Sequence, residues 1–105
     1  MPYFIYTTDR EGGEAIRDEH RAAHIGYLES VQAHLIASGG VQDETGKFVG
    51  GLIIVDYETR AEVDEFIAND PFDKAGLFGS VTVSRWRQTF LHGRLDRGPF
   101  VPLQT

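Results

Sequence analysis

The chain opens on a short run that is rich in aromatic and β-branched residues. Residues Tyr3–Thr8 read Tyr-Phe-Ile-Tyr-Thr-Thr, and Asp9 and the pair Gly12-Gly13 follow them. An apolar run of this composition that ends at turn residues is typical of a β-strand. We therefore predict a first strand over Tyr3–Thr8.

The next segment changes to a helical period. Good helix formers fill Glu14–Ala33, and four residues recur at i, i+4, i+7 and i+11: His24, Leu28, Val31 and Leu35. This spacing places them on one face of a helix. We predict an amphipathic helix over Glu14–Ala33.

Two apolar runs then flank a polar loop. Leu35–Ala37 suits either a continued helix or a strand, because short apolar runs are ambiguous. Val49–Tyr57 contains Leu-Ile-Ile-Val, and a polar stretch with Asp-Glu-Thr-Gly at residues 43–46 precedes it. Two strands around such a loop form a hairpin, so we interpret Leu35–Ala37 as its first strand.

A second helix is marked at both ends. Thr59 and Glu62 have the spacing of a capping box, which predicts a helix start at Arg60. Its apolar stripe is Val63, Phe66 and Ile67. Pro71 ends the helix, because its ring moves the preceding Asp70 out of the α region.

The last part of the chain holds one more strand and a tail. A turn is expected within Phe72–Leu77. In Val81–Arg87 the residues alternate, with Val81 and Val83 on one face and Trp86 on the other. The tail Gln88–Thr105 is broken by Gly93, Gly98-Pro99 and Pro102, which favours an arm that lies across a partner chain rather than a regular element.

The resulting order, βαββαβ, predicts an α+β fold of the ferredoxin-like kind, with two helices on one face of a four-stranded antiparallel sheet. The first strand is apolar at its odd and at its even positions, so both faces of the sheet are too apolar to face water. This indicates a homodimer packed through its sheets. We expect one domain over residues 1–87, with residues 88–105 as a C-terminal arm of that domain or of the dimer contact.

The composition excludes several classes of partner and of catalysis. The 105 residues carry 10 basic and 16 acidic side chains, a net charge of −6 without a basic cluster, so nucleic acid is not an expected partner. No apolar run approaches the roughly 20 residues of a membrane span, and no secretory signal opens the chain. We expect a soluble, cytoplasmic protein. The absence of cysteine excludes thiolate catalysis and cysteine-bound zinc.

His24 is the polar member of an apolar helical stripe, so its ring needs a hydrogen-bond partner. Asp70, just past the second helix, is the candidate. Both residues have simpler explanations: a histidine satisfied in the core, and an Asp-Pro turn that bonds its own backbone. His20 and His24 stand at i, i+4, but no third ligand accompanies them, and we expect no metal site.

Other familiar signatures do not fit. Gly39-Gly40 and Gly50-Gly51 flank strands and do not open a helix, so they make no nucleotide-binding loop. No G-x-S-x-G elbow marks a nucleophilic serine.

A more specific pattern runs through Tyr3–Arg87. It consists of Arg21-x-x-His24, Tyr27-Leu28, Ser38-Gly39, Gly51, Asp70-Pro71-Phe72, Ala75-Gly76-Leu77 and Trp86. With these residues the sequence resembles the YciI-like family. The chain departs from the family at Gly40, where proline usually follows Ser-Gly.

The resemblance implies a dimeric ferredoxin-like α+β barrel with a His/Asp pair, here His24 and Asp70, and no cofactor. One member type is a dehydrochlorinase that eliminates chloride from a chlorinated hydroxyhydroquinone. In that reaction Asp70 would orient His24, and His24 would take a phenolic proton. The expected substrate is therefore a small hydroxylated aromatic molecule.

Four further residues are candidates for substrate binding. Arg21 lies one turn before His24 and is placed to hold a substrate oxygen, unless it forms an exposed salt bridge. Phe72, Phe78 and Tyr6 offer an aromatic wall, which core packing explains equally well. The alternative to an enzyme is a non-catalytic dimer that binds a small ligand or serves as an interaction module, with His24 purely structural.

Overall fold

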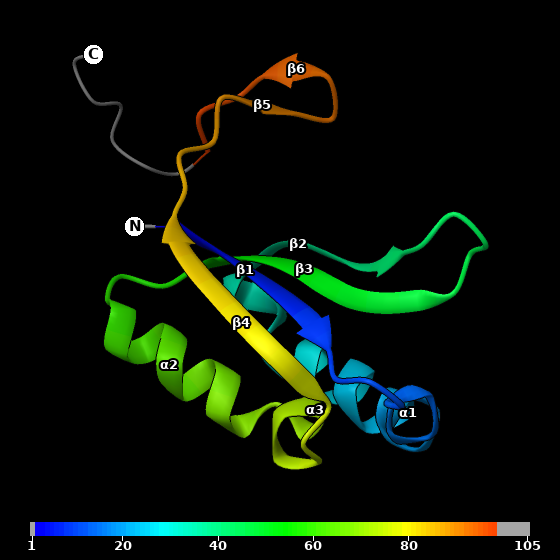
Figure 1. The fold of residues 1–105 in the computed structure, drawn as a ribbon. Helices are drawn as coiled ribbons and strands as arrows, with labels where there is room; N and C mark the ends of the chain where they lie inside the picture. The colour runs from blue at the N-terminus through cyan, green and yellow to red at the C-terminus, as the bar shows by residue number, and fades with distance from the viewer. Residues whose placement is uncertain (1, 99–105) are drawn as a thin grey trace.

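The computed structural model describes residues 2–98. Its centre is an antiparallel sheet in the order β2-β3-β1-β4 (Figure 1). The strands are β1 (Pro2–Asp9), β2 (Leu35–Gln42), β3 (Phe48–Asp56) and β4 (Phe78–Arg85). Three helices cover one face: α1 (Glu14–Ser30), α2 (Arg60–Asn69) and the single turn α3 (Pro71–Lys74). The predicted βαββαβ order of an α+β fold is confirmed.

The strand register decides which side chains meet the helices. Ile5 lies opposite Ile53 and Val83, and Tyr3 opposite Val55. Because residues directly opposite each other share a face, these positions form the inner surface of the sheet, and they pack against Leu28, Val63 and Phe66 of the helices.

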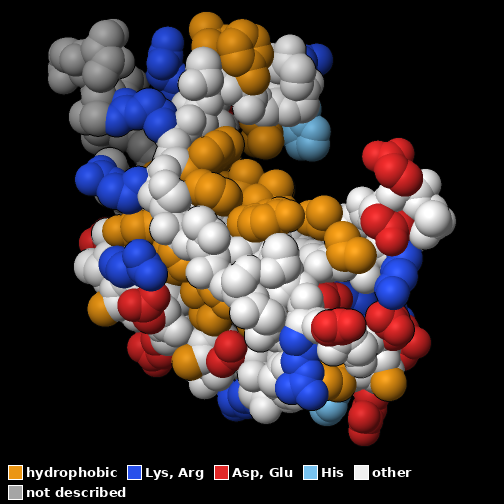
Figure 2. Space-filling view, viewed as in Figure 1, with side chains coloured by type: hydrophobic (Ala, Val, Ile, Leu, Met, Phe, Trp, Pro, Cys, Tyr) orange, Lys and Arg blue, Asp and Glu red, His pale blue; other side chains and the backbone are white. Residues whose placement is uncertain are grey.

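The outer face carries the intervening positions. Tyr6 lies opposite Leu52, and Phe4 opposite Ile54. Figure 2 shows hydrophobic side chains gathered across this face, between the sheet and the C-terminal hairpin above it. None of the helices in residues 2–98 covers these side chains. The sequence predicted such an apolar second face, because the first strand is apolar at its odd and at its even positions.

The first helix is shorter than predicted. It ends at Ser30 rather than Ala33, and a 3₁₀ turn over Gln32–His34 follows. The Val31 N–H donates to the Leu28 carbonyl at 3.1 Å, an i→i−3 bond that tightens the last turn. The apolar stripe therefore continues past the helix end, and periodicity alone did not locate that end.

The hairpin strand β2 is longer than predicted. It runs through Ser38-Gly39-Gly40 to Gln42, opposite β3. A Cβ at Gly40 would stand about 2.5 Å from the Phe48 ring, so glycine here makes room for an aromatic side chain of the partner strand. Gly40, which looks like part of a loop in the sequence, is therefore a close-packed position of the sheet, whereas a Cβ at Gly39 would meet nothing within 4 Å.

The second helix starts as predicted. Thr59 and Glu62 form the complete capping box. Pro71 then opens α3 at its first position, and the strand β4 begins at Phe78, three residues before the predicted Val81. Asp9 lies opposite Phe78 across a bulge that leaves Gly79 of β4 without a paired residue, and this pairing extends β4 toward its start.

The tail differs from the arm that we expected. Phe90–Leu91 (β5) and Arg94–Leu95 (β6) form a small hairpin. His92 and Gly93 both have positive φ, 53° and 75°, which is the pattern of a type I′ turn. His-Gly is a weak signal for this turn, so the sequence did not reveal it. The rest of the predicted arm, residues 99–105, lies outside the described residues.

Within residues 2–98, none of the helices combines the length and the apolar character that crossing a membrane requires.

Candidate functional site

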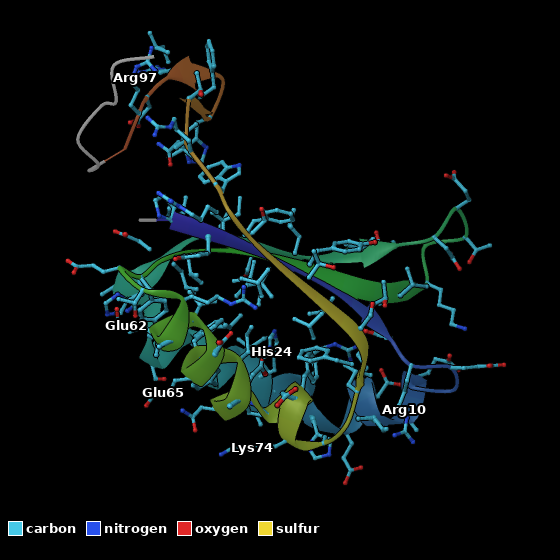
Figure 3. The ribbon with its side chains drawn as sticks, turned by 60° about the vertical axis from the view of Figure 1, so that its left-hand side comes forward. Arg10, His24, Glu62, Glu65, Lys74 and Arg97 are labelled. Carbon is cyan, nitrogen blue, oxygen red and sulfur yellow. The ribbon has the colours of Figure 1, made fainter. Side chains whose placement is uncertain are left out.

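The structure brings His24 and Asp70 together from separate elements. His24 is on the third turn of α1, and Asp70 is the residue between α2 and α3. Their side chains meet at 2.8 Å, from Nδ1 of His24 to Oδ1 of Asp70. Figure 3 shows His24 among the side chains between the helices, below the sheet.

The backbone conformation of Asp70 directs its side chain toward His24. Asp70 has φ −69° and ψ 127°, the extended conformation that a following proline favours. Its Oδ1 also accepts the Phe72 N–H at 2.9 Å, so the carboxylate caps α3 while it holds the histidine. With 2% of its side chain exposed, this carboxylate needs both donors.

Asp70 determines which ring nitrogen of His24 remains available. A carboxylate accepts, so in the neutral imidazole Nδ1 is the nitrogen that carries the proton and Nε2 is the one that presents a lone pair. No hydrogen bond of Nε2 occurs in residues 2–98, and no side-chain nitrogen or oxygen in this part of the chain is both buried and unpaired. Nε2 is therefore accessible, on a side chain that is 16% exposed.

A pocket of about 260 Å³ adjoins His24. Its wall comes from every layer of the fold: α1, α3 and the inner faces of the strands. The side chains that line it include Thr7, Arg17, Ile25, Leu28, Phe48 and Ile53, and the backbone of Gly39 and Gly51 completes it. Most of this lining is apolar, and the charged groups in it come from α1.

Two of the three predicted aromatic candidates line this pocket. Phe72 stacks on the His24 ring, with centroids 4.1 Å apart and planes 16° from parallel. Phe78 lines the wall as well. Tyr6 does not: it points to the outer face of the sheet, where it is 37% exposed. The odd-even alternation of β1, with Ile5 and Thr7 inward, places Tyr6 on the opposite side.

Arg21 also lines the pocket, but it forms the exposed salt bridge that we considered as the alternative to substrate binding. Its guanidinium bonds Asp18 at 3.1 Å, and 42% of its side chain is exposed. It lies over the Phe48 ring at 5.9 Å. Arg21 therefore stands at the rim of the pocket.

Arg17 is the pocket residue that sequence reasoning missed. It is buried, pairs with Asp9 through two bonds of 2.8 and 2.9 Å, and lies over the rings of Phe72 and Phe48 at 5.0 and 5.6 Å. A signal was present, because Arg17 precedes His24 by seven residues and so belongs to the same helical stripe.

The neighbouring Tyr27 is held as a neutral phenol. The pKa of Tyr27 is raised to about 12, mainly because the side chain is buried and to a smaller extent because the Tyr57 and Asp70 side chains are near. Its hydroxyl donates to the Phe66 carbonyl at 2.8 Å. Tyr27 therefore serves as a hydrogen-bond donor between α1 and α2 at neutral pH.

The described residues, 2–98, contain no cluster of three or more His, Cys, Asp or Glu that is placed to hold a metal ion. His20, the metal candidate considered with His24, lies 3.8 Å from Glu19 at the surface of α1.

Comparison with solved structures finds a 5-chloro-2-hydroxyhydroquinone dehydrochlorinase (TftG) from Burkholderia phenoliruptrix AC1100, in complex with 2,5-dihydroxybenzoquinone. The TM-score is 0.77 and the identity 36%, over 83% of this chain and 94% of that chain. A protein of Arabidopsis thaliana shares 14% identity over 86% of this chain and 96% of its own, with a TM-score of 0.47. None of the curated proteins matches.

The model of the YCII-related domain matches residues 1–87. That range contains the whole sheet, the three helices and both members of the His24–Asp70 pair. The chain therefore belongs to the YCII-related domain family.

Proposed function

We propose that this protein is a small enzyme that uses His24 and Asp70 for general acid/base chemistry on a hydroxylated aromatic metabolite. The specific reaction that we propose is the elimination of chloride from a chlorinated hydroxyhydroquinone. The observation that carries the proposal is the hydrogen bond from His24 to a buried carboxylate, which leaves Nε2 accessible beside a pocket.

The pair is arranged as a positioned base. The 2.8 Å bond to Asp70 fixes the tautomer and the ring orientation of His24, and the carboxylate stabilises the imidazolium that forms when Nε2 takes a proton. Phe72 stacks on the same ring and restricts its rotation. A structural histidine needs the hydrogen bond, but it does not need an accessible Nε2.

The elimination is redox-neutral and balances with one base. His24 takes the proton of a ring hydroxyl and returns it to the carbon that carries chlorine, which creates a ketone and a tetrahedral carbon. The base then takes the proton of a second hydroxyl. The electrons of that O–H bond form a second carbonyl, the ring double bond of that carbon shifts to the carbon that carries chlorine, and the C–Cl pair leaves as chloride. One proton and one chloride are lost, and the product is a hydroxyquinone.

The pocket suits a single ring. Its 260 Å³ is just below the roughly 300–1,000 Å³ of pockets for drug-sized ligands. Phe72 and Phe78 supply aromatic walls. The relative with 36% identity is a dehydrochlorinase in complex with a dihydroxybenzoquinone, which supports the same substrate class for this chain.

The test is chloride release and absorbance with purified protein and a panel of chlorinated hydroquinones. We expect His24→Ala to lower turnover by about 10²–10⁴-fold, the usual contribution of a general base. His20→Ala is the matched control, because His20 lies one turn earlier on α1 and does not line the pocket. Both variants are checked by urea unfolding.

Two results would contradict the proposal. Equal turnover in His24→Ala and the wild type would remove the catalytic role of the pair. Saturable binding of the panel without chloride release or any other conversion would instead identify the alternative, a small-ligand-binding module.

A further inference from the structure

Arg17 joins three parts of the fold. Its Nε and Nη2 bond the two carboxylate oxygens of Asp9 at 2.8 and 2.9 Å, and Nη2 also bonds the Gly50 carbonyl at 3.1 Å. These bonds tie α1 to the end of β1 and to β3. The side chains of Arg17 and Asp9 are each 10% exposed, so the pair is almost completely removed from water.

The bonds account for two of the three guanidinium nitrogens. Nη1 has no hydrogen-bond partner in residues 2–98, although a guanidinium always carries its five N–H donors. No side-chain nitrogen in this part of the chain is both buried and unpaired, so Nη1 is accessible. Arg17 lines the pocket, which is the space where a buried guanidinium can meet a ligand.

The surroundings favour a particular ligand atom. Nη1 presents N–H donors of a permanent cation, whose strongest acceptors are anionic oxygens. The Phe72 ring contacts both functional groups, with His24 stacked at 4.1 Å and the Arg17 Cζ at 5.0 Å. Because His24 and Arg17 both line the pocket, a single planar ring in it can meet the two residues with different substituents.

We propose that Nη1 of Arg17 donates to an anionic oxygen on the ring of the ligand, so that the pocket prefers single-ring phenolates or enolates over neutral rings of the same shape. The inference rests on the proposed function for the identity of the ring as a substrate. In catalysis His24 takes the proton of one ring oxygen while Arg17 holds another oxygen as its negative charge grows. Arg21, at the rim, is not required for this preference.

The test measures binding, without turnover. Titration calorimetry compares 4-nitrophenol, at a pH where it is fully ionised, with its methyl ether 4-nitroanisole. We expect the wild type to bind the phenolate about 10- to 100-fold more tightly, the usual effect of a charge-assisted hydrogen bond. Arg17→Gln should abolish this preference, and Arg21→Gln should keep it.

A loss of folding is separated from a loss of recognition. Arg17→Gln leaves the Asp9 carboxylate unpaired and is expected to be less stable. The double variant Asp9→Asn with Arg17→Gln replaces the ion pair by two neutral amides. Arg17→Lys keeps the charge. Arg60→Gln, which removes an exposed ion pair with Asp64 on α2, is the control and should keep the preference.

Each outcome decides the inference. Equal affinity of the wild type for the two probes overturns it. So does a preference that survives in folded Arg17→Gln or in the folded double variant, both of which lack the cation, or one that is lost in Arg21→Gln alone. If the preference depends on Arg17 while no chlorinated hydroquinone is converted, the proposed function fails and the phenolate site stands.

Discussion

Asp70 combines two hydrogen-bonding tasks in one buried carboxylate. Its Oδ1 accepts the Phe72 N–H at 2.9 Å and meets His24 Nδ1 at 2.8 Å. The structural explanation, a capped turn, and the functional one, an orienting partner, are therefore not alternatives here. The cap fixes the carboxylate, and the fixed carboxylate can then orient the histidine.

Substitution at Asp70 separates these tasks. Asp70→Asn keeps an oxygen for the Phe72 N–H but loses the charge that stabilises an imidazolium, so we expect the fold to persist and turnover to fall by about 10²–10⁴-fold. Asp70→Ala should also lose about 1 kcal/mol of stability with the cap. Chloride release as a function of pH and urea unfolding measure the two effects. An unchanged rate and pH profile in Asp70→Asn would leave Asp70 with the capping role alone.

Several residues of the pocket could be predicted singly, because their signal is local. The odd histidine of the apolar stripe and the Asp-Pro pair both stand out in the sequence. Phe48 does not, since a phenylalanine at a strand start is ordinary, and the only signal for Arg17 is its place on the helical stripe of His24. Only the pairing of β2 with β3, with Gly40 against the Phe48 ring, carries Phe48 into the pocket wall.

Between elements, Tyr27 joins α1 to the end of α2. Its hydroxyl bonds the Phe66 carbonyl at 2.8 Å, one of the last four carbonyls of α2, which have no partner within the helix. The two rings also stack, with centroids 5.5 Å apart. This contact helps to hold Asp70, just after α2, against His24.

The contact makes the stability of the fold depend on alkaline pH. Because the pKa of Tyr27 is raised from 10.0 to about 12 in the folded chain, its contribution is complete below pH 10 and is lost as the pH rises toward 12. Below pH 10, Tyr27→Phe should lower the free energy of unfolding by about 1 kcal/mol. Above pH 10, the difference in the free energy of unfolding between the wild type and Tyr27→Phe should shrink. Urea unfolding across this range measures both, and a difference that stays constant with pH would contradict the assignment.

Boundaries with a local chemical signal were easier to predict than boundaries set by packing. Thr59 with Glu62 marked the start of α2, and Pro71 marked its end, through hydrogen bonds and dihedral limits that belong to a few adjacent residues. The end of α1, the extent of β2 and the start of β4 depend on what packs or pairs against them. The sequence pattern therefore placed these three boundaries wrongly.

On the scale of the whole molecule, the outer face of the sheet carries apolar side chains that none of the helices in residues 2–98 covers. Phe4, Tyr6, Leu52 and Ile54 share this face, and Tyr6 and Leu52 are 37% and 39% exposed. Figure 2 shows the band that these hydrophobic side chains belong to. A contiguous apolar band of this kind is typical of an interface.

We expect a homodimer packed through this face. Light scattering coupled to gel filtration should give twice the chain mass, and Leu52→Asp should give one chain mass, because it places a charge in the centre of the contact. Ala61→Asp, on the exposed side of α2, is the control and should leave the dimer intact. A wild-type protein that elutes as a single chain would contradict the expectation.

The sequence by itself determined the order of elements and singled out His24 and Asp70 as a candidate pair. These follow from periodicity, caps and a proline, which act within a few residues. Only the tertiary structure decided that Tyr6 faces away from the pocket, that Arg17 is buried with one free nitrogen and that the tail folds into a hairpin. Those facts depend on strand register, on an ion pair between α1 and β1 and on a turn conformation, and residues far apart in the chain or weak local signals set them.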